Sequence, residues 1–156
     1  MTESAVSALP DPAPGQIQPW TDNPRFWQID GQPVLLIGGT VEDNLFQVAN
    51  LEPHLDDLVA CGGNYARCTM SSRDKGDAWP FEQDNATGLY DLQSARGPFW
   101  ERFGHFLHLT RDRAIVIQIE IFDRFDFAQD PWQANPFNPK NNINYTSGES
   151  GLAEDY

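Results

Sequence analysis

Strand patterns alternate with helix patterns between residues 34 and 122, and this alternation constrains the fold more than any other feature of the chain. The strands are predicted from apolar runs and, in the last of them, from alternating isoleucines. The helices are predicted from apolar residues at helical spacing, each with a proline in the first turn. The predicted order is a strand at 34–37, a helix from Pro53 to the stop at Gly62-Gly63, a strand at 64–70, a helix from Pro98 and a strand at 114–122.

Parallel strands joined by helices restrict where the helices lie. Because βαβ crossovers are right-handed, two successive crossovers in one direction place both helices on the same face of the sheet. The other face stays uncovered, and three strands with two helices do not close a domain unless that face meets something else. A barrel curls that face inward, but it needs eight strands and roughly 250 residues. We therefore expect an α/β fold that is an incomplete (β/α)8 TIM barrel, about the first three βα units, in a truncated reading frame or fragment. A small open α/β domain is the alternative.

The remaining segments carry weaker patterns. Residues 1–19 are rich in proline and lack periodicity, which predicts a disordered leader before a barrel-like domain over 20–156. Asp30-Gly31 between two apolar runs predicts a β-hairpin that precedes the barrel strands. Residues 71–97 show no clear periodicity, and a connection of that length is typical of a binding loop or an insert. No regular element is predicted after Asp123.

The composition excludes several classes of partner. The chain has 156 residues and a formal net charge of -13, which argues against nucleic acid or an anionic membrane surface as a partner. No apolar run approaches the roughly 20 residues of a membrane span. The N-terminus lacks the basic start and apolar stretch of a secretory signal, which predicts a cytoplasmic protein, with secretion as the alternative. Two cysteines, Cys61 and Cys68, make no disulfide scaffold and have no nearby histidine base.

Side chains alternate between the two faces of a sheet, so the positions along the last two predicted strands indicate which residues share a face. The isoleucines of the last strand should face the helices. The side chains expected to point into the barrel, toward the strand ends where this fold has its active site, are Arg67, Thr69, Gln118 and Glu120. An isolated buried charge is costly, so Arg67 needs a carboxylate partner, either Glu120 or a carboxylate from another strand. An Arg67–Glu120 pair could support catalysis or merely fill the barrel.

Polar and aromatic residues follow the last strand in the run Asp123-Arg124-Phe125-Asp126-Phe127. Carboxylates and arginine hydrogen-bond sugar hydroxyls, while flat rings cover the apolar face of a sugar. We therefore predict a carbohydrate-binding surface with Asp123, Arg124 and Asp126 as polar contacts. Trp79 and Trp132 are the candidate platforms, and ordinary packing is the alternative for each.

No metal or cofactor site is predicted. His105 and His108 lie three residues apart on the second helix, but they lack the H-E-x-x-H pattern and are expected on a solvated face. Asp123, Asp126 and Asp130 do not match the EF-hand ligand spacing.

Four short segments carry a family resemblance. Residues 23–27, 62–67, 122–127 and 135–145 resemble cellulase-like (β/α)8 glycoside hydrolases, most closely uncharacterised bacterial members of the broad retaining clan. The resemblance covers about residues 20–156. It implies that Arg67 hydrogen-bonds the nucleophilic carboxylate, and it adds Asn142 to the candidate substrate-binding residues.

The same resemblance places the acid/base glutamate after the fourth barrel strand and the nucleophile after the seventh, and the chain is expected to contain neither. Retaining hydrolysis needs two carboxyl groups about 5–5.5 Å apart. We therefore predict a glycoside hydrolase-like protein that acts on O-glycosyl bonds only in the complete barrel, with Arg67 and Glu120 as supporting residues. The alternatives are a non-catalytic carbohydrate-binding protein, or an interaction domain that self-associates through an uncovered sheet face around Tyr65, Val116 and Phe122.

Overall fold

The computed structural model describes residues 14–155 of the chain. The chain divides into two compact units, Met1–Leu36 and Ile37–Tyr156. Residues 1–13, which make up most of the predicted leader, lie outside the described residues.

The first unit is a small antiparallel sheet of three strands in the order β1 (Ile17–Pro19), β2 (Trp27–Ile29) and β3 (Gln32–Val34). Asp30 and Gly31 connect β2 to β3 with φ angles of 49° and 77°. Two successive positive φ angles are the geometry of a type I′ turn, so the predicted hairpin is confirmed. Strand β1 forms within the segment that was predicted to be disordered.

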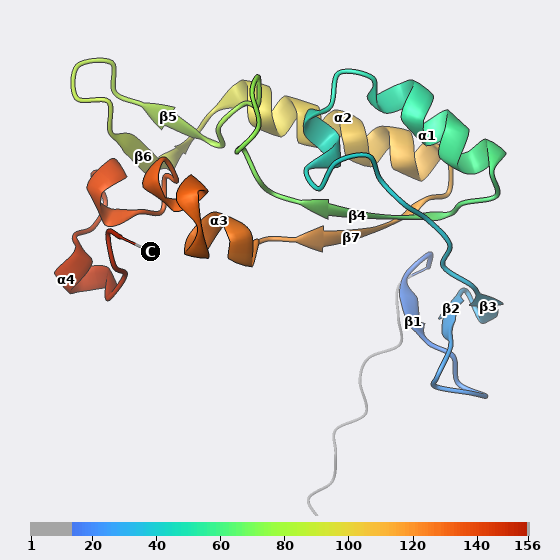
Figure 1. The fold of residues 1–156 in the computed structure, drawn as a ribbon. Coiled ribbons are helices and arrows are strands. Elements are labelled where there is room, and N and C mark those ends of the chain that lie inside the picture. Colours follow the sequence, from blue (N-terminus) through green and yellow to red (C-terminus); the bar gives the residue numbers. More distant parts are fainter. Residues whose placement is uncertain (1–13, 156) are drawn as a thin grey trace, which may run out of the picture. The chain divides into compact units, whose positions relative to one another are not determined.

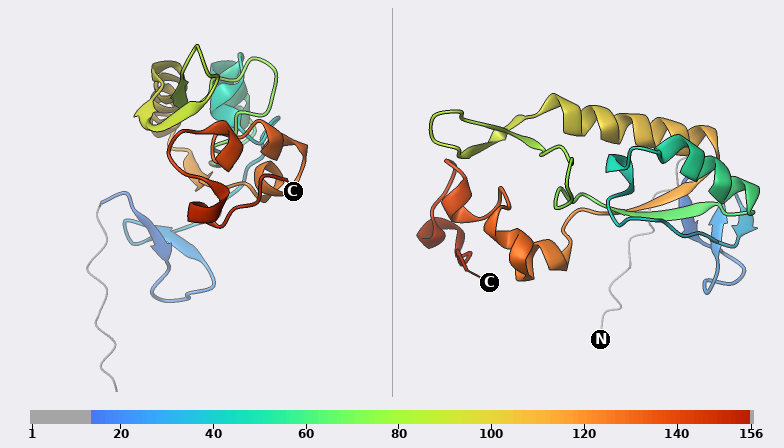
Figure 2. Two further views of the ribbon diagram at one scale, coloured as in Figure 1. Left: turned by 90° about the vertical axis from the view of Figure 1, so that its left-hand side faces the viewer. Right: turned by 45° about the horizontal axis from the view of Figure 1, so that its top comes forward.

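The second unit contains the predicted βαβ arrangement. Strands β4 (Tyr65–Thr69) and β7 (Val116–Glu120) pair in parallel, and their arrowheads point the same way in Figure 1. Helices α1 (Leu51–Ala60) and α2 (Gly97–Asp112) both lie on one side of this pair (Figures 1 and 2). The parallel pairing and the common face of the two helices follow the sequence prediction.

The hydrophobic core lies between the parallel pair and the two helices. Its fully buried members include Leu55 of α1, Ala66 and Cys68 of β4, and Phe99 and Phe106 of α2. The 3-10 helix η1 (Leu45–Gln47) contributes Leu45 and Phe46 to the same cluster. Ile117 and Ile119 of β7 pack against this core, as expected of the isoleucines of the last strand.

The opposite face of the pair is polar rather than apolar. The Tyr65 hydroxyl donates to Gln118 Oε1 at 2.5 Å, and Gln118 Nε2 donates to Glu120 Oε1 at 3.3 Å. Tyr65 and Val116 are half-buried, while Phe122 just beyond β7 is 65% exposed. The apolar surface that was expected here is thus limited to the end of the strand, and self-association stays a prediction.

The prediction of a regular first barrel strand over residues 34–37 is wrong. Leu35 is 68% exposed and Ile37 is 52% exposed, although an unbroken apolar run is typical of a strand buried on both faces. The first residue of the run joins the hairpin as part of β3, and its last residue, Ile37, with the adjacent Gly38, contacts the start of β4. A Cβ at Gly38 would lie 1.6 Å from the Tyr65 carbonyl oxygen, so only glycine fits this close approach.

Two regions contain elements that were not predicted. The connection over residues 71–97 holds the antiparallel hairpin of β5 (Phe81–Gln83) and β6 (Tyr90–Ala95). The segment after Asp123 forms α3 (Arg124–Ala128), the 3-10 helices η2 (Asp130–Gln133) and η3 (Pro139–Asn141), and α4 (Ser147–Ser150). Asparagine amides bind the backbone there: Asn142 Nδ2 donates to the carbonyls of Pro136 and Asn138.

The chain is therefore a mixed α/β protein with small sheets, including one parallel pair. Residues 14–155 do not close a barrel, because they supply only two hydrogen-bonded parallel strands where a barrel needs eight.

Candidate functional site

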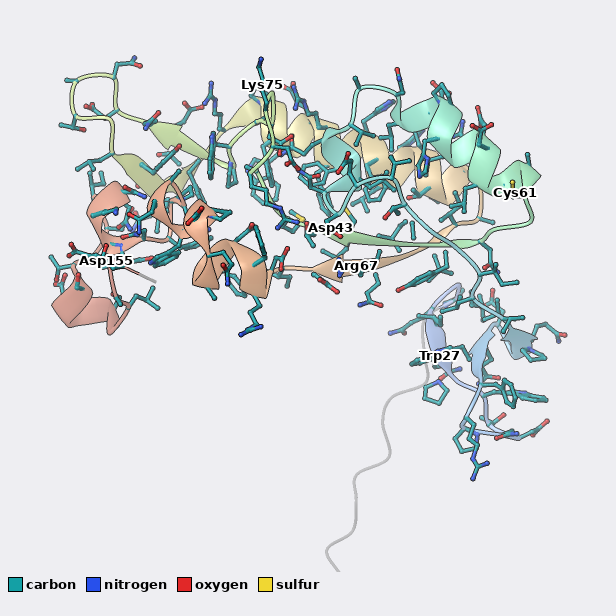
Figure 3. All side chains as sticks on the ribbon, in the orientation of Figure 1. Trp27, Asp43, Cys61, Arg67, Lys75 and Asp155 are labelled. Carbon is teal, nitrogen blue, oxygen red and sulfur yellow. The ribbon has the colours of Figure 1, made fainter. Side chains whose placement is uncertain are left out.

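The ends of β4 and β7 bring an arginine between two carboxylates. Arg67 Nη1 donates to Glu120 Oε2 at 3.1 Å and to Oε1 at 3.3 Å, and Arg67 Nη2 donates to Asp43 Oδ1 at 2.6 Å. Asp43 belongs to the segment before η1, and its backbone carbonyl accepts a hydrogen bond from the Thr69 N–H at 2.8 Å. Figure 3 shows Asp43 and Arg67 next to each other at β4. The predicted Arg67–Glu120 pair is confirmed, and Asp43 is an additional partner.

A second arginine extends this cluster of charges. Arg73, just after β4, donates to Asp43 Oδ2 at 2.8 Å, to Asp123 Oδ2 at 2.5 Å and to Asp126 Oδ1 at 2.8 Å. Its side chain is mostly buried, as are those of Asp123 and Asp126. Asp43 is thus shared by both arginines, and the six residues form one connected group. We call it the strand-end network; its members are Asp43, Arg67, Arg73, Glu120, Asp123 and Asp126.

Local backbone geometry supplies two of these carboxylates. Asp123 is the N-cap of α3, and its Oδ1 accepts a hydrogen bond from the Phe125 N–H at 2.9 Å. The first turn of α3 then presents Asp126 on the same side, where both carboxylates reach Arg73. A short helix that begins directly after β7 therefore completes the network.

The network lowers the pKa of Asp123 and raises the pKa values of both arginines. Burial alone would raise the pKa of Asp123, but hydrogen bonds from Arg73 and from the Phe125 N–H, together with the positive charges of Arg73 and Arg67, lower the pKa below its ordinary value. The hydrogen bond to Asp43 raises the pKa of Arg67. Burial alone would lower the pKa of Arg73, but its hydrogen bonds to Asp123 and Asp126 raise it. Two guanidinium groups against four carboxylates leave the network with a net charge of about -2 when all are ionised.

The other predicted site residues are distributed differently. Arg124 is exposed on α3. Trp79 is half-buried, with its ring centroid 5.8 Å from that of Tyr90. Trp132 is buried, and its indole N–H donates to the Ala153 carbonyl at 2.9 Å. Trp132 thus has the packing role that was the alternative, while the role of Trp79 as a platform stays a prediction.

Asn142 is also buried. Its Nδ2 binds two backbone carbonyls, and its Oδ1 accepts hydrogen bonds from the backbone N–H groups of Asn144 and Tyr145. Its amide therefore holds the C-terminal segment together.

Sequence reasoning missed Arg73 and Asp43. The alternation along β4 continues past Thr69 to Ser71 and then to Arg73, so the same reasoning that selected Arg67 could have reached it. Asp43 follows the first apolar run of the barrel-like pattern, and a strand-end position could have indicated it.

One cavity lies beside Arg73 and another beside η1. A cavity of about 40 Å³ beside Arg73 is lined by Trp79, Pro80 and Phe137, among others. A larger cavity of about 900 Å³ is lined by η1, the start of α1 and α2. Its polar groups bind one another: Asp77 accepts from Asn44 at 2.6 Å, and Arg102 donates to Gln47 and to the Gly76 carbonyl. Burial raises the pKa of Asp77. Asn44, Gln47, Asp77 and Arg102 in the wall of the larger cavity are therefore already hydrogen-bonded.

The described residues hold no group of three or more His, Cys, Asp or Glu side chains with the geometry of a metal site. His105 and His108 are exposed on α2. Cys61 is exposed, and Cys68 is buried, which raises the pKa of its thiol. Among residues 14–155, no helix is both long and apolar enough to span a membrane.

Comparison with known proteins gave no match: no family model, no curated protein and no solved structure is similar to this chain.

Proposed function

We propose that this chain is the N-terminal part of a (β/α)8 glycoside hydrolase-like domain, and that its strand-end network binds carbohydrate. The observation that carries the proposal is the position of that network. Glu120 is the last residue of β7, and Arg73 and Asp123 follow the carboxyl ends of β4 and β7. Arg67 and Glu120 lie on the face that the helices leave free. In barrels of this kind, that edge and that face form the active site.

The architecture of the second unit supports the barrel. Both helices pack on one face of β4 and β7, as the first units of a barrel require (Figure 1). The segment around Gly38 runs alongside β4 on the side away from β7, through bonds from the Asn64 and Tyr65 N–H groups to the Ile37 carbonyl. Three neighbouring chain segments are therefore in the order expected of the first three barrel strands.

The chemistry of the network supports a sugar as the ligand. Ionised carboxylates accept hydrogen bonds from hydroxyl groups, and guanidinium groups donate to ring and hydroxyl oxygens. Asp43 and Arg67 are partly exposed, so their polar atoms can reach a ligand. In the complete barrel, the resemblance gives Arg67 the role of binding the nucleophilic carboxylate, and Glu120 is bound to Arg67 Nη1.

The chain alone is proposed to bind but not hydrolyse. Retaining hydrolysis needs one carboxyl group that is protonated and one that is ionised, on either side of the glycosidic bond. The strand-end carboxylates are each bound to an arginine, and the pKa of Asp123 is lowered rather than raised. None of these groups has the environment of a proton donor.

Replacing Arg67 by alanine tests the binding site. A panel of cellohexaose, xylohexaose and mannohexaose is titrated against the full chain by isothermal calorimetry. At least one sugar should bind, and Arg67→Ala should weaken that binding at least about tenfold, because it removes a charge-assisted donor, releases Glu120 and leaves Asp43 bound to Arg73 alone. Arg111→Ala is the matched control, since Arg111 is an exposed arginine on α2. Equal binding by the Arg67 variant, or no binding by the native chain, would reject the proposal.

Incubation of the same sugars and of aryl glycosides with the chain tests the absence of hydrolysis. We expect no released product at high protein concentration, with Glu120→Gln as the control. Product formation that disappears in the Glu120 variant would make Glu120 catalytic rather than supporting.

A further inference from the structure

One aromatic ring borders the strand-end network with much of its surface free. Phe125 of α3 is 50% exposed. The Arg73 guanidinium carbon lies 5.0 Å from the centroid of the Phe125 ring, which is the distance of a cation–π contact. Three carboxylates hold the Arg73 side chain. The guanidinium group that the Phe125 ring contacts is therefore fixed in position.

The backbone of Phe125 is held as well. Its N–H donates to Asp123 Oδ1 at 2.9 Å, which ties the residue to the N-cap of α3. A ring with a fixed backbone and a fixed neighbour loses little conformational freedom when a ligand stacks on it. Trp79 and Trp132 do not have this arrangement, because Trp79 packs near Tyr90 and Trp132 is buried.

The charges around the ring restrict the class of sugar. Arg67 and Arg73 are already bound to four carboxylates of the chain itself. An anionic sugar would have to displace one of these carboxylates and would meet the excess negative charge of the network. A neutral sugar needs only hydroxyl donors for the carboxylates and an apolar face for the ring.

We infer that the strand-end site selects a neutral pyranose, stacked on Phe125, and discriminates against uronates and sulfated sugars. This inference rests on the proposed function, because it specifies the ligand of the same site. It makes Phe125 a specificity-determining residue, and it assigns Arg73 the role of positioning the ring.

The test compares neutral and anionic sugars of equal length on the full chain. The sugar of the neutral panel that binds best and hexagalacturonate are titrated at low and at moderate salt, by saturation-transfer NMR or calorimetry. The neutral sugar should bind at least about tenfold more tightly at low salt, and the difference should shrink as salt screens the repulsion. Tighter binding of hexagalacturonate would overturn the charge argument while leaving carbohydrate binding in place.

Three variants test the ring. Phe125→Leu keeps apolar bulk but removes the flat face, so neutral-sugar binding should weaken about five- to tenfold. Phe125→Trp should retain binding within about threefold, because a larger ring still offers a stacking face. Phe26→Ala is the matched control, since Phe26 of the N-terminal unit is exposed to the same degree, 51%.

The outcomes separate this inference from the proposed function. If Phe125→Leu binds like the native chain while Arg67→Ala does not bind, the sugar site stands and the stacking inference is wrong. If no sugar binds the native chain, the proposed function fails and the inference fails with it. Loss of binding in Phe125→Leu with retention in Phe125→Trp is the result that supports the inference.

Discussion

Replacing Phe106 by alanine is expected to lower the free energy of unfolding by about 4 kcal/mol. Phe106 of α2 is fully buried in the core between the helices and the parallel pair, and it packs near Phe103. The substitution removes the burial of an aromatic ring and leaves a cavity that the surrounding strands fill only partly. A loss of this size is a large fraction of the total stability of a domain.

Urea unfolding followed by circular dichroism measures this change. Leu107→Ala is the matched control, because Leu107 is the next residue of the same helix and is exposed. It should change stability by less than about 0.5 kcal/mol. Equal effects of the two substitutions would mean that α2 does not pack on the sheet through the face that carries Phe99 and Phe106.

Replacing Arg73 by alanine is expected to lower the free energy of unfolding by about 3 kcal/mol. The change leaves Asp123 and Asp126 mostly buried without their positive partner, and it leaves Asp43 bound to Arg67 alone. Helix α3 should detach first, because Arg73 links both of its carboxylates to the loop after β4. Chemical denaturation, with Arg111→Ala as the exposed control, measures the effect. A change within about 0.5 kcal/mol would show that the network does not stabilise the fold.

The effect of Arg73 should depend on pH. The pKa of Asp123 is lowered in the folded chain, so its stabilising contribution is present above the unfolded pKa, about 3.9, and is lost as pH falls through the lower folded value. The Arg73→Ala variant keeps the burial that raises the pKa of Asp123 but loses the Arg73 hydrogen bond and charge that lower it. The pKa of Asp123 should therefore be higher in the variant. The stability difference between the native chain and the variant should therefore be largest near neutral pH and shrink in acid. Carboxyl-carbon NMR titration of Asp123 measures this shift directly.

The regular elements that build the core were predictable because their signals are local and periodic. Alternating isoleucines predicted β7, and apolar residues between a proline and a glycine pair predicted α1. The core face of α2 was predicted less completely. Leu107 and Leu109 lie about 80° to either side of Phe99 around the helix axis, so spacing alone could not decide that Leu109 is buried and Leu107 exposed.

Elements held by side chain–backbone bonds were not predictable in this way. The C-terminal segment depends on asparagine amides such as Asn138 and Asn142, which stabilise turns without any hydrophobic period. The first predicted barrel strand failed for a different reason. Its apolar residues need neighbours on both faces, and the described part of the chain leaves Leu35 and Ile37 exposed.

The candidate site was half predictable. Alternation on β4 and β7 identified the pairing of Arg67 with Glu120, because the two strands lie side by side with Arg67 opposite Gln118. Arg73, Asp43 and Asp126 meet only because a loop, a segment before η1 and a short helix converge in three dimensions. Alternation and strand-end position could have indicated Arg73 and Asp43 singly, but not that both would bind the same set of carboxylates and arginines.

The most direct test of the carbohydrate site is a map of backbone amide shifts on the full chain. Nitrogen-15-labelled protein is titrated with the best-binding neutral hexasaccharide, and the shift of each amide is followed to saturation. The account predicts that the shifts concentrate at the strand ends, in residues 67–73 and 120–126, and that amides of α1 and at the start of β4 stay in place. Shifts confined to α1 and α2, or no shift at saturating sugar, would contradict it.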